Sequence, residues 1–231
     1  MPFQISAELR YTVFEQSTLL LNLHALETSN QTITDESFTV TQSATCEFFP
    51  LETGENRYVR LDTSGVSDLL INYDVTVVTN PSVREVHAIS HIPLAMIEHE
   101  VLPYLFASRY CQSDRLGRLA SKHFGHITHP LAQASAVSDW IFENIDYVSG
   151  STDTDTGTSA YDTVTQRAGV CRDFAHLGIA FCRALCIPAR YFTGYACEMQ
   201  PPDFHACFEV CVGNEGFVFD PTRLSAPNGW V

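Results

Sequence analysis

The stretch Gly169–Gly178, GVCRDFAHLG, places a cysteine directly before a helical pattern that continues until Ile187-Pro188. Within that pattern, apolar residues recur at the spacing of one buried helix face, at Phe174, Leu177, Gly178, Phe181 and Leu185. Cys171 lies off this face, at the N-terminal end of the expected helix. There, unpaired backbone N–H groups and the positive end of the helix dipole favour a thiolate. The same N–H groups can donate to an oxyanion, so the position suits a nucleophile.

A nucleophilic cysteine needs a base, and the base needs a group that orients it. The downstream sequence FHACFEVCVGNEGFVFDPT consists of two alternating runs around Gly213-Asn214, which predicts a hairpin with a two-residue II′ loop. In that register Cys207 faces Asp220, and His205 is a diagonal neighbour of Asp220 on the same face, roughly 7–8 Å away at the backbone. A loop shifted by one residue would point the two side chains to opposite faces.

The first third of the chain alternates with period two. Ile5–Val13 puts its apolar residues on one face, and the runs beginning at Leu19 and Leu69 repeat the pattern. Shorter β-like runs occur at Phe38–Thr41, Cys46–Phe49 and Tyr58–Leu61. Alternating strands separated by polar turns are typical of an antiparallel assembly, so we predict a β-sandwich domain over residues 1–80. Because no catalytic cluster is visible there, we interpret it as a structural or docking module.

Near Asn80-Pro81 the spacing of the apolar residues changes from period two to helical spacing, and residues 81–231 are predicted to form an α+β core. Helices are expected at Pro93–Tyr104, Ser113–Phe124 and Pro130–Ile145. The polar segment Ser149–Asp162 follows directly before the cysteine-containing stretch. We interpret it as a loop, either a lid or substrate rim or a solvated connection.

Composition limits the classes of function. The 231 residues carry a formal net charge of -14, which argues against a nucleic-acid or anionic-membrane partner and favours neutral or basic substrates. No run of apolar residues is long enough for a membrane span, and the first ten residues do not have the pattern of a signal peptide. We therefore expect a cytoplasmic protein whose eight cysteines are free thiols. The sequence does not indicate an oligomeric state.

Three ordered stretches, GVCRDFAHLGIAFCRALCIPARYFTGY, DFHACFEV and FVFDPTR, resemble the bacterial transglutaminase-like family of the papain-like superfamily. The resemblance covers roughly residues 100–231, and the β-rich N-terminal region resembles the sandwich domain that precedes the core in that family. It implies a papain-like α+β core in which a helix carrying the cysteine packs against a β-sheet. Carried over to this sequence, the triad falls on Cys171, His205 and Asp220 as nucleophile, general base and acid, and orienter of the imidazole.

Two features depart from the family pattern. The family usually has an aromatic residue, often Trp, two positions after the histidine, and Cys207 stands there in this sequence. We interpret Cys207 as a smaller wall that widens the pocket, with a redox partner for Cys171 as the alternative. Arg172 and Asp173 are further candidates for the site wall. The sequence also stops at Val231, where relatives continue, so we expect a C-terminally truncated core with an incomplete site wall.

The expected reaction is acyl transfer on an amide through a thioester on Cys171. The backbone N–H of Cys171 would supply one oxyanion donor, and Gln166 and Tyr147 are candidates for the second. Water would release an acid, and an amine would release a new amide. We favour hydrolysis of a peptide or isopeptide bond in a peptide or protein substrate, because hydrolysis needs no second binding site.

The sequence also allows other hypotheses for the function. One is arylamine-type acetyl transfer from a coenzyme thioester, and another is a catalytically silent binding module. A third is zinc binding by Cys182, Cys186, Cys197, Cys207, Cys211 or His205, although a Cys-x₃-Cys pair on a helix is a weak signal and no Cys-x₂-Cys knuckle is present. Asp153, Asp155 and Gly157 hint at calcium, but a closing Glu is missing, so we expect no metal and no cofactor. His87, His91 and His99 are interpreted as solvated.

Overall fold

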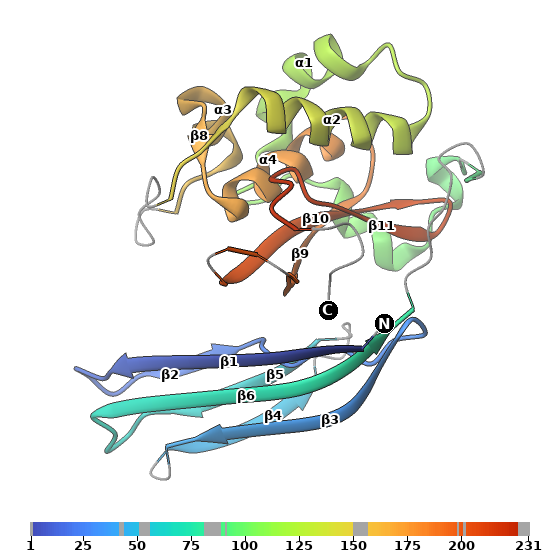
Figure 1. The fold of residues 1–231 in the computed structure, drawn as a ribbon. Helices are drawn as coiled ribbons and strands as arrows, with labels where there is room; N and C mark the ends of the chain where they lie inside the picture. The colour runs from blue at the N-terminus through green and yellow to red at the C-terminus, as the bar shows by residue number, and fades with distance from the viewer. Residues whose placement is uncertain are drawn as a thin grey trace. The chain divides into compact units, whose positions relative to one another are not determined.

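The computed structural model describes residues 2–41, 44–50, 56–80, 89–90, 92–149, 157–197, 199–200 and 202–225. The chain is a mixed α+β protein with two compact units, one built from residues 1–82 and the other from residues 83–230 (Figure 1). No helix among the described residues is long and apolar enough to cross a membrane.

The N-terminal unit contains two three-stranded sheets in which every strand pairing is antiparallel. One sheet has the order β1-β6-β3, with β1 at Pro2–Thr12, β6 at Asp68–Thr79 and β3 at Gln31–Val40. The other has the order β2-β5-β4, with β2 at Thr18–Leu21, β5 at Arg57–Asp62 and β4 at Thr45–Pro50. The predicted strands are therefore present, and β3 is longer than the sequence pattern indicated.

In this unit, alternate side chains along a strand are buried and form one apolar face. Along β6 the side chains at Leu69, Ile71, Tyr73, Val75 and Val77 are buried, while their neighbours are partly or fully exposed. Leu61 of the other sheet joins Leu69 and Ile71 in one apolar cluster. Burying this face between two sheets supplies the main driving force for the unit, because apolar surface is removed from water on both sides.

The second unit combines helices with a three-stranded antiparallel sheet of order β11-β10-β9. The helices are α1 (Ser113–Phe124), α2 (Pro130–Asn144), α3 (Ala160–Gln166) and α4 (Cys171–Ala184). The strands of the sheet are β9 (Ala189–Tyr195), β10 (Phe204–Val212) and β11 (Glu215–Phe219). In Figure 1, α4 lies against β10, with α1 and α2 on its other side.

Helix α4 is the centre of this unit. Every residue from Asp173 to Cys182 is buried, so the helix is covered on all sides and not only along the predicted stripe. The helix approaches the sheet closely at Gly178, where an added Cβ would lie 2.5 Å from ring carbons of Phe208 on β10. The absence of a side chain at Gly178 therefore sets how closely α4 docks on the sheet.

Some expected elements differ in the structure. Pro93–Tyr104 forms two 3₁₀ helices, η2 (Leu94–Met96) and η3 (His99–Leu105), in place of an α-helix. Pro103 within η3 has no N–H to donate, which disfavours a regular α-helical ladder. Helix α3 also begins inside the segment expected to be a loop. The pattern missed α3 because the helix has only seven residues.

Local capping explains where α3 starts. The carboxylate of Asp162 accepts a hydrogen bond of 3.0 Å from the backbone N–H of Ser159, the residue before the helix.

Of the three histidines interpreted as solvated, His99 is exposed. The following residues lie outside the described part of the chain: His87, His91, Asp153, Asp155 and Val231.

Candidate active site

Cys171 is the first residue of α4 and is partly buried. Its position is fixed by the residues around it. The carboxylate of Asp173, which is completely buried, accepts a hydrogen bond of 2.9 Å from the backbone N–H of Val170, the residue before the helix. A Cβ at Gly169 would lie 2.8 Å from the Cβ of Asp173, so the glycine makes room for this cap. The first turn of α4 is thus anchored directly beside the thiol.

The hairpin of β10 and β11 has the predicted register. Its loop is Gly213-Asn214, and Val212 pairs with Glu215. Both loop residues have positive φ, +65° and +62°, so the turn is of the I′ class and the predicted II′ type was wrong. Asn tolerates the left-handed region that this turn requires at its second position. The register, which does not depend on the turn type, continues from the pairing of Phe208 with Phe219 and brings Asp220 beside the start of β10.

This register brings an imidazole and a carboxylate together. Nε2 of His205 lies 3.2 Å from Oδ2 of Asp220, and the His205 side chain is almost completely buried. Thr222 completes the group: its hydroxyl donates to Oδ1 of Asp220 at 2.6 Å, and its backbone N–H donates to the same oxygen at 2.9 Å. The Thr222 hydroxyl oxygen also lies 3.3 Å from Nε2 of His205. Sequence reasoning did not single out Thr222, although it lies only two residues after Asp220.

The electrostatics of this group favour a charged imidazole. Burial lowers the pKa of His205, but interactions with Asp220 and with the Cys171 side chain outweigh burial and raise the pKa to about 9. Burial raises the pKa of Asp220, whereas hydrogen bonds from His205 and Thr222 outweigh that effect and hold the pKa below its ordinary value. At neutral pH the pair is therefore an imidazolium facing a carboxylate.

The sulfur of Cys171 belongs to the same group. Interaction with the Cys171 side chain contributes to the raised pKa of His205. The pKa of Tyr191 on β9 is raised, first by burial and next by the charge of Cys171. The structure thus brings together Cys171, His205 and Asp220, the three residues of the expected triad.

Of the two candidates for a second oxyanion donor, Tyr147 lies at the thiol. Tyr147 is in β7 (Asp146–Tyr147), which pairs in parallel with β8 (Ala168–Gly169) immediately before the cysteine. Burial raises the pKa of Tyr147, and so does the charge of Cys171, while a hydrogen bond with the Cys171 backbone lowers it. Gln166 is exposed at the end of α3, and its side chain makes no hydrogen bond within the described residues.

The three residues expected to form the site wall occupy different places. Cys207 is fully buried, and burial raises the pKa of its thiol, with further contributions from the charges of Asp220 and Cys171. It therefore underlies the site and does not form an exposed surface. Arg172 is partly exposed, with Nε 3.6 Å from Oδ1 of Asp173. Asp173 is turned toward the backbone of Val170, where it caps α4.

An aromatic stack beside the cysteine was not found from the sequence. The ring of His176 on α4 lies nearly parallel to that of Tyr110, with centroids 5.2 Å apart, and also contacts the ring of Tyr191 at 5.2 Å in a tilted arrangement. Burial, together with the charge of Arg172, lowers the pKa of His176 to about 4, so the stacked ring is neutral at physiological pH. His176 lies five residues after Cys171, which is the sequence signal that was available for it.

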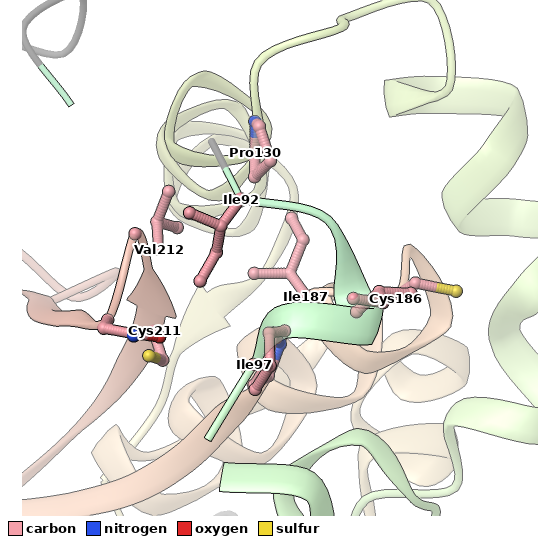
Figure 2. Close-up of a pocket in the computed structure, with 11 residues that line it drawn as sticks. Ile92, Ile97, Pro130, Cys186, Ile187, Cys211 and Val212 are labelled. Carbon is pink, nitrogen blue, oxygen red and sulfur yellow. The ribbon is translucent and has the colours of Figure 1, made fainter. Parts of the chain in front are cut away.

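A small apolar groove lies elsewhere in the second unit (Figure 2). It is formed where the segment around η2 meets the start of α2 and the turn of the β10–β11 hairpin. Residues lining it include Ile92, Ile97, Pro130, Cys186, Ile187 and Cys211. The three residues of the expected triad do not line this groove, so its shape does not define the substrate of the cysteine.

Two family models match the chain. The model described as "Bacterial transglutaminase, N-terminal domain" matches residues 1–100, and the model described as "Transglutaminase-like superfamily" matches residues 118–231. The chain is also 46% identical in sequence to a "Putative Cysteine Protease" from Cytophaga hutchinsonii of known crystal structure. That similarity covers 100% of this chain and 82% of the other, with a TM-score of 0.92. The chain belongs to the transglutaminase-like superfamily, and its α+β core has the transglutaminase-like, papain-like fold.

Other relatives are more distant. Uncharacterized protein ML0607 of Mycobacterium leprae is 36% identical over 78 residues, which is 34% of this chain. The match spans only 25% of the length of ML0607. The periplasmic domain of TgpA from Pseudomonas aeruginosa is 17% identical, with a TM-score of 0.47, over 96% of this chain and 74% of that domain.

Proposed function

We propose that this protein is a cysteine-dependent enzyme that transfers the acyl group of an amide through a thioester on Cys171. The observation that carries the proposal is the buried His205, which lies 3.2 Å from Asp220 and whose pKa is raised in part by the Cys171 side chain. Acyl transfer requires a nucleophile, a base next to it and a group that orients the base. Membership of the transglutaminase-like superfamily supports the same reaction class.

The first half of the reaction forms the thioester. In the resting pair the proton of Cys171 is already on His205, and the thiolate sulfur attacks the amide carbonyl carbon to form a tetrahedral oxyanion. Since Nε2 of His205 faces Asp220, Nδ1 is the nitrogen that exchanges protons with the sulfur and the substrate. The imidazolium then protonates the leaving nitrogen, the C–N bond breaks, and an amine departs. Asp220 stays ionised and stabilises the imidazolium throughout.

The oxyanion needs donors that point at it as its charge develops. The backbone N–H of Cys171, at the start of α4, is one donor. We assign the hydroxyl of Tyr147 as the second donor, because this hydroxyl lies against the backbone N–H of Cys171. In the absence of substrate the Cys171 N–H donates to the Tyr147 hydroxyl oxygen, so the oxyanion would take the place of that contact and accept from both groups.

The second half of the reaction releases the acyl group. His205 takes a proton from water, the resulting hydroxide equivalent attacks the thioester carbon, and Cys171 leaves as the acid is released. An amine in place of water gives a new amide. We favour hydrolysis of a peptide or isopeptide bond, with a neutral or basic peptide or protein as substrate because the chain carries a net charge of -14.

Alkylation with iodoacetamide at mildly acidic pH, followed by mass spectrometry, tests the activated thiol. We expect Cys171 to be labelled much faster than Cys186, which is exposed and serves as an internal reference for an ordinary accessible thiol. His205→Ala should remove the difference between the two cysteines. Labelling of Cys171 no faster than Cys186 in the wild-type protein would contradict the proposal.

Substrate assays then separate the reaction classes. We expect a panel of fluorogenic peptide amides to be hydrolysed by the wild-type protein and not by Cys171→Ala. Turnover of acetyl-coenzyme A with an arylamine, without amide hydrolysis, would instead indicate acetyl transfer. Selective labelling of Cys171 without turnover of either substrate class would point to a silent binding module and count against the proposed reaction.

A further inference from the structure

Three different kinds of metal ligand meet beneath the candidate active site. The imidazole of His205, the thiol of Cys207 and the carboxylate of Asp220 place one ligand atom each within 4.8 Å of one another. His205 and Cys207 are buried, and Asp220 is only slightly exposed. The sulfur of Cys171 is not part of this cluster. The cluster exists because β10 presents two residues of one face, at i and i+2, opposite the end of β11.

We propose that His205, Cys207 and Asp220 form a binding site for a thiophilic divalent cation such as Zn²⁺, and that the bound ion switches off Cys171. The proposed metal binding rests only on the geometry of the three ligand atoms. The inhibitory half rests on the proposed function, because it requires that His205 serve Cys171 as a base.

The size of the cluster suits a small cation. Ligand bonds of about 2.0–2.3 Å in a tetrahedral site place the ligand atoms about 3.5 Å apart. The present separations require shifts of about 1 Å or less in each side chain, which rotations about side-chain bonds supply. Asp220 follows the last residue of β11 and lies outside the ladder, so Oδ2 can shift by rotation of the side chain while Oδ1 keeps its hydrogen bonds from Thr222. Three protein ligands leave a fourth position for water.

Charge balance also favours a divalent ion. A cation of charge +2 bound by the thiolate of Cys207 and the carboxylate of Asp220 gives a site with no net charge, which suits a buried position. On binding, the thiol of Cys207 and the imidazolium of His205 each release one proton to solvent. Binding should therefore release up to two protons per ion and weaken as the pH falls.

The inhibitory effect follows from which imidazole nitrogen binds the ion. Nε2 of His205 faces Asp220 and is the nitrogen on the side of the cluster. A metal on Nε2 leaves the remaining ring proton on Nδ1, the nitrogen that must accept the proton of Cys171. The ring is then neutral and cannot act as a base toward the sulfur. The ion also occupies Asp220, which no longer stabilises an imidazolium.

Cobalt provides a direct test, because Co²⁺ bound to a thiolate gives a sulfur-to-metal charge-transfer band. We expect the intact protein to show this band with one ion bound per chain, and Zn²⁺ to displace it. Cys207→Ala and Cys207→Ser should lose the band and this ion. Cys211→Ala is the matched control, since Cys211 lies on the same strand four residues away and outside the cluster. Cys171→Ala should also keep the band.

The outcomes separate the two halves of the proposal. A band that persists in both folded Cys207 variants, or disappears in Cys171→Ala, would overturn the assigned ligands. For inhibition, Zn²⁺ should slow the alkylation of Cys171 in the intact protein, and this slowing should be lost in Cys207→Ser relative to the same variant without metal. Zinc binding with no slowing would overturn the switch. Failure of the proposed function would appear as unselective labelling of Cys171 before any metal is added.

Discussion

The hydroxyl of Thr222 donates a hydrogen bond of 2.6 Å to Oδ1 of Asp220, and the same hydroxyl oxygen lies 3.3 Å from Nε2 of His205. Thr222 therefore touches both partners of the imidazole–carboxylate pair. Its backbone N–H donates to the same carboxylate oxygen, so Asp220 is fixed from two directions. The carboxylate keeps its orientation toward His205 because one residue, two positions along the chain, holds its other oxygen.

Thr222→Val should impair the reactivity of Cys171 while preserving the shape of the side chain. Hydrogen bonds to charged groups contribute about 1.5–3 kcal/mol, so we expect the alkylation rate of Cys171 to fall by roughly tenfold or more. Thr222→Ser keeps the hydroxyl and should retain most of the rate. The measurement is the second-order rate constant for iodoacetamide, with circular dichroism to establish that both variants fold. Equal rates in the two variants would show that the hydroxyl has no role.

The stability of the protein should depend on pH through His205. The pKa of this residue is raised from 6.5 to about 9 in the folded state, so the folded chain holds the proton more tightly than the unfolded chain does. The stabilisation is fully present below about pH 6.5 and is lost as the pH rises through about 9. Asp220 does not contribute in this window, since its pKa is lowered and it remains ionised. We expect the free energy of unfolding to decrease between these limits.

Urea denaturation of the wild-type protein and of His205→Gln, at several pH values from 6 to 9.5, checks this expectation. The difference in unfolding free energy between the two proteins should shrink as the pH rises. The comparison removes the contributions of other groups that titrate in the same range, which both proteins share. A difference that is constant or grows with pH would mean that the folded state does not raise the pKa of His205.

The sequence was most informative where one local signal fixed a long-range relationship. The position of the Gly213-Asn214 loop fixed which residues of the two strands share a face of the hairpin. This register was enough to place Asp220 near His205. The apolar stripe of α4 likewise predicted the helix that begins at Cys171. In both cases the periodicity of a regular element carried the information, so few assumptions about tertiary packing were needed.

Features that depend on contacts between elements could not be predicted in this way. His176 on α4 contacts the rings of Tyr110, from a loop, and Tyr191, from β9. The sequence pattern of a single segment does not reveal a contact between three separate segments. Asp173 was interpreted as part of the site wall because it follows the nucleophile. Its capping role was hidden because Val170, at the N-cap, is not a typical capping residue.

Gly178→Ala should destabilise the protein even though alanine is the better helix former. The new methyl group would lie 2.5 Å from the ring of Phe208, which is completely buried. Overpacking of this kind costs about 1–3 kcal/mol, more than the gain of about 1 kcal/mol from helix propensity. Chemical denaturation measures the change in unfolding free energy.

Gly117→Ala in α1 is the matched control. An added Cβ at Gly117 would meet nothing within 4 Å, so only the helix propensity should act. We expect this variant to gain about 0.5–1 kcal/mol in stability. If both variants were stabilised by the same amount, the close packing of α4 on β10 at Gly178 would be refuted.

Asp173→Ala should reduce both the stability of the protein and the reactivity of Cys171. The substitution leaves the backbone N–H of Val170 without its acceptor, at a cost of about 1–3 kcal/mol, and frees the first turn of α4, where the thiol lies. Asp162→Ala is the matched control, because Asp162 caps α3 in the same way at Ser159 and does not cap the helix that carries the thiol. Urea denaturation should show both variants to be less stable, whereas iodoacetamide should alkylate Cys171 more slowly only in Asp173→Ala. Equal slowing in the two variants would mean that the reactivity of Cys171 follows overall stability, and not the local anchoring of the residue before it.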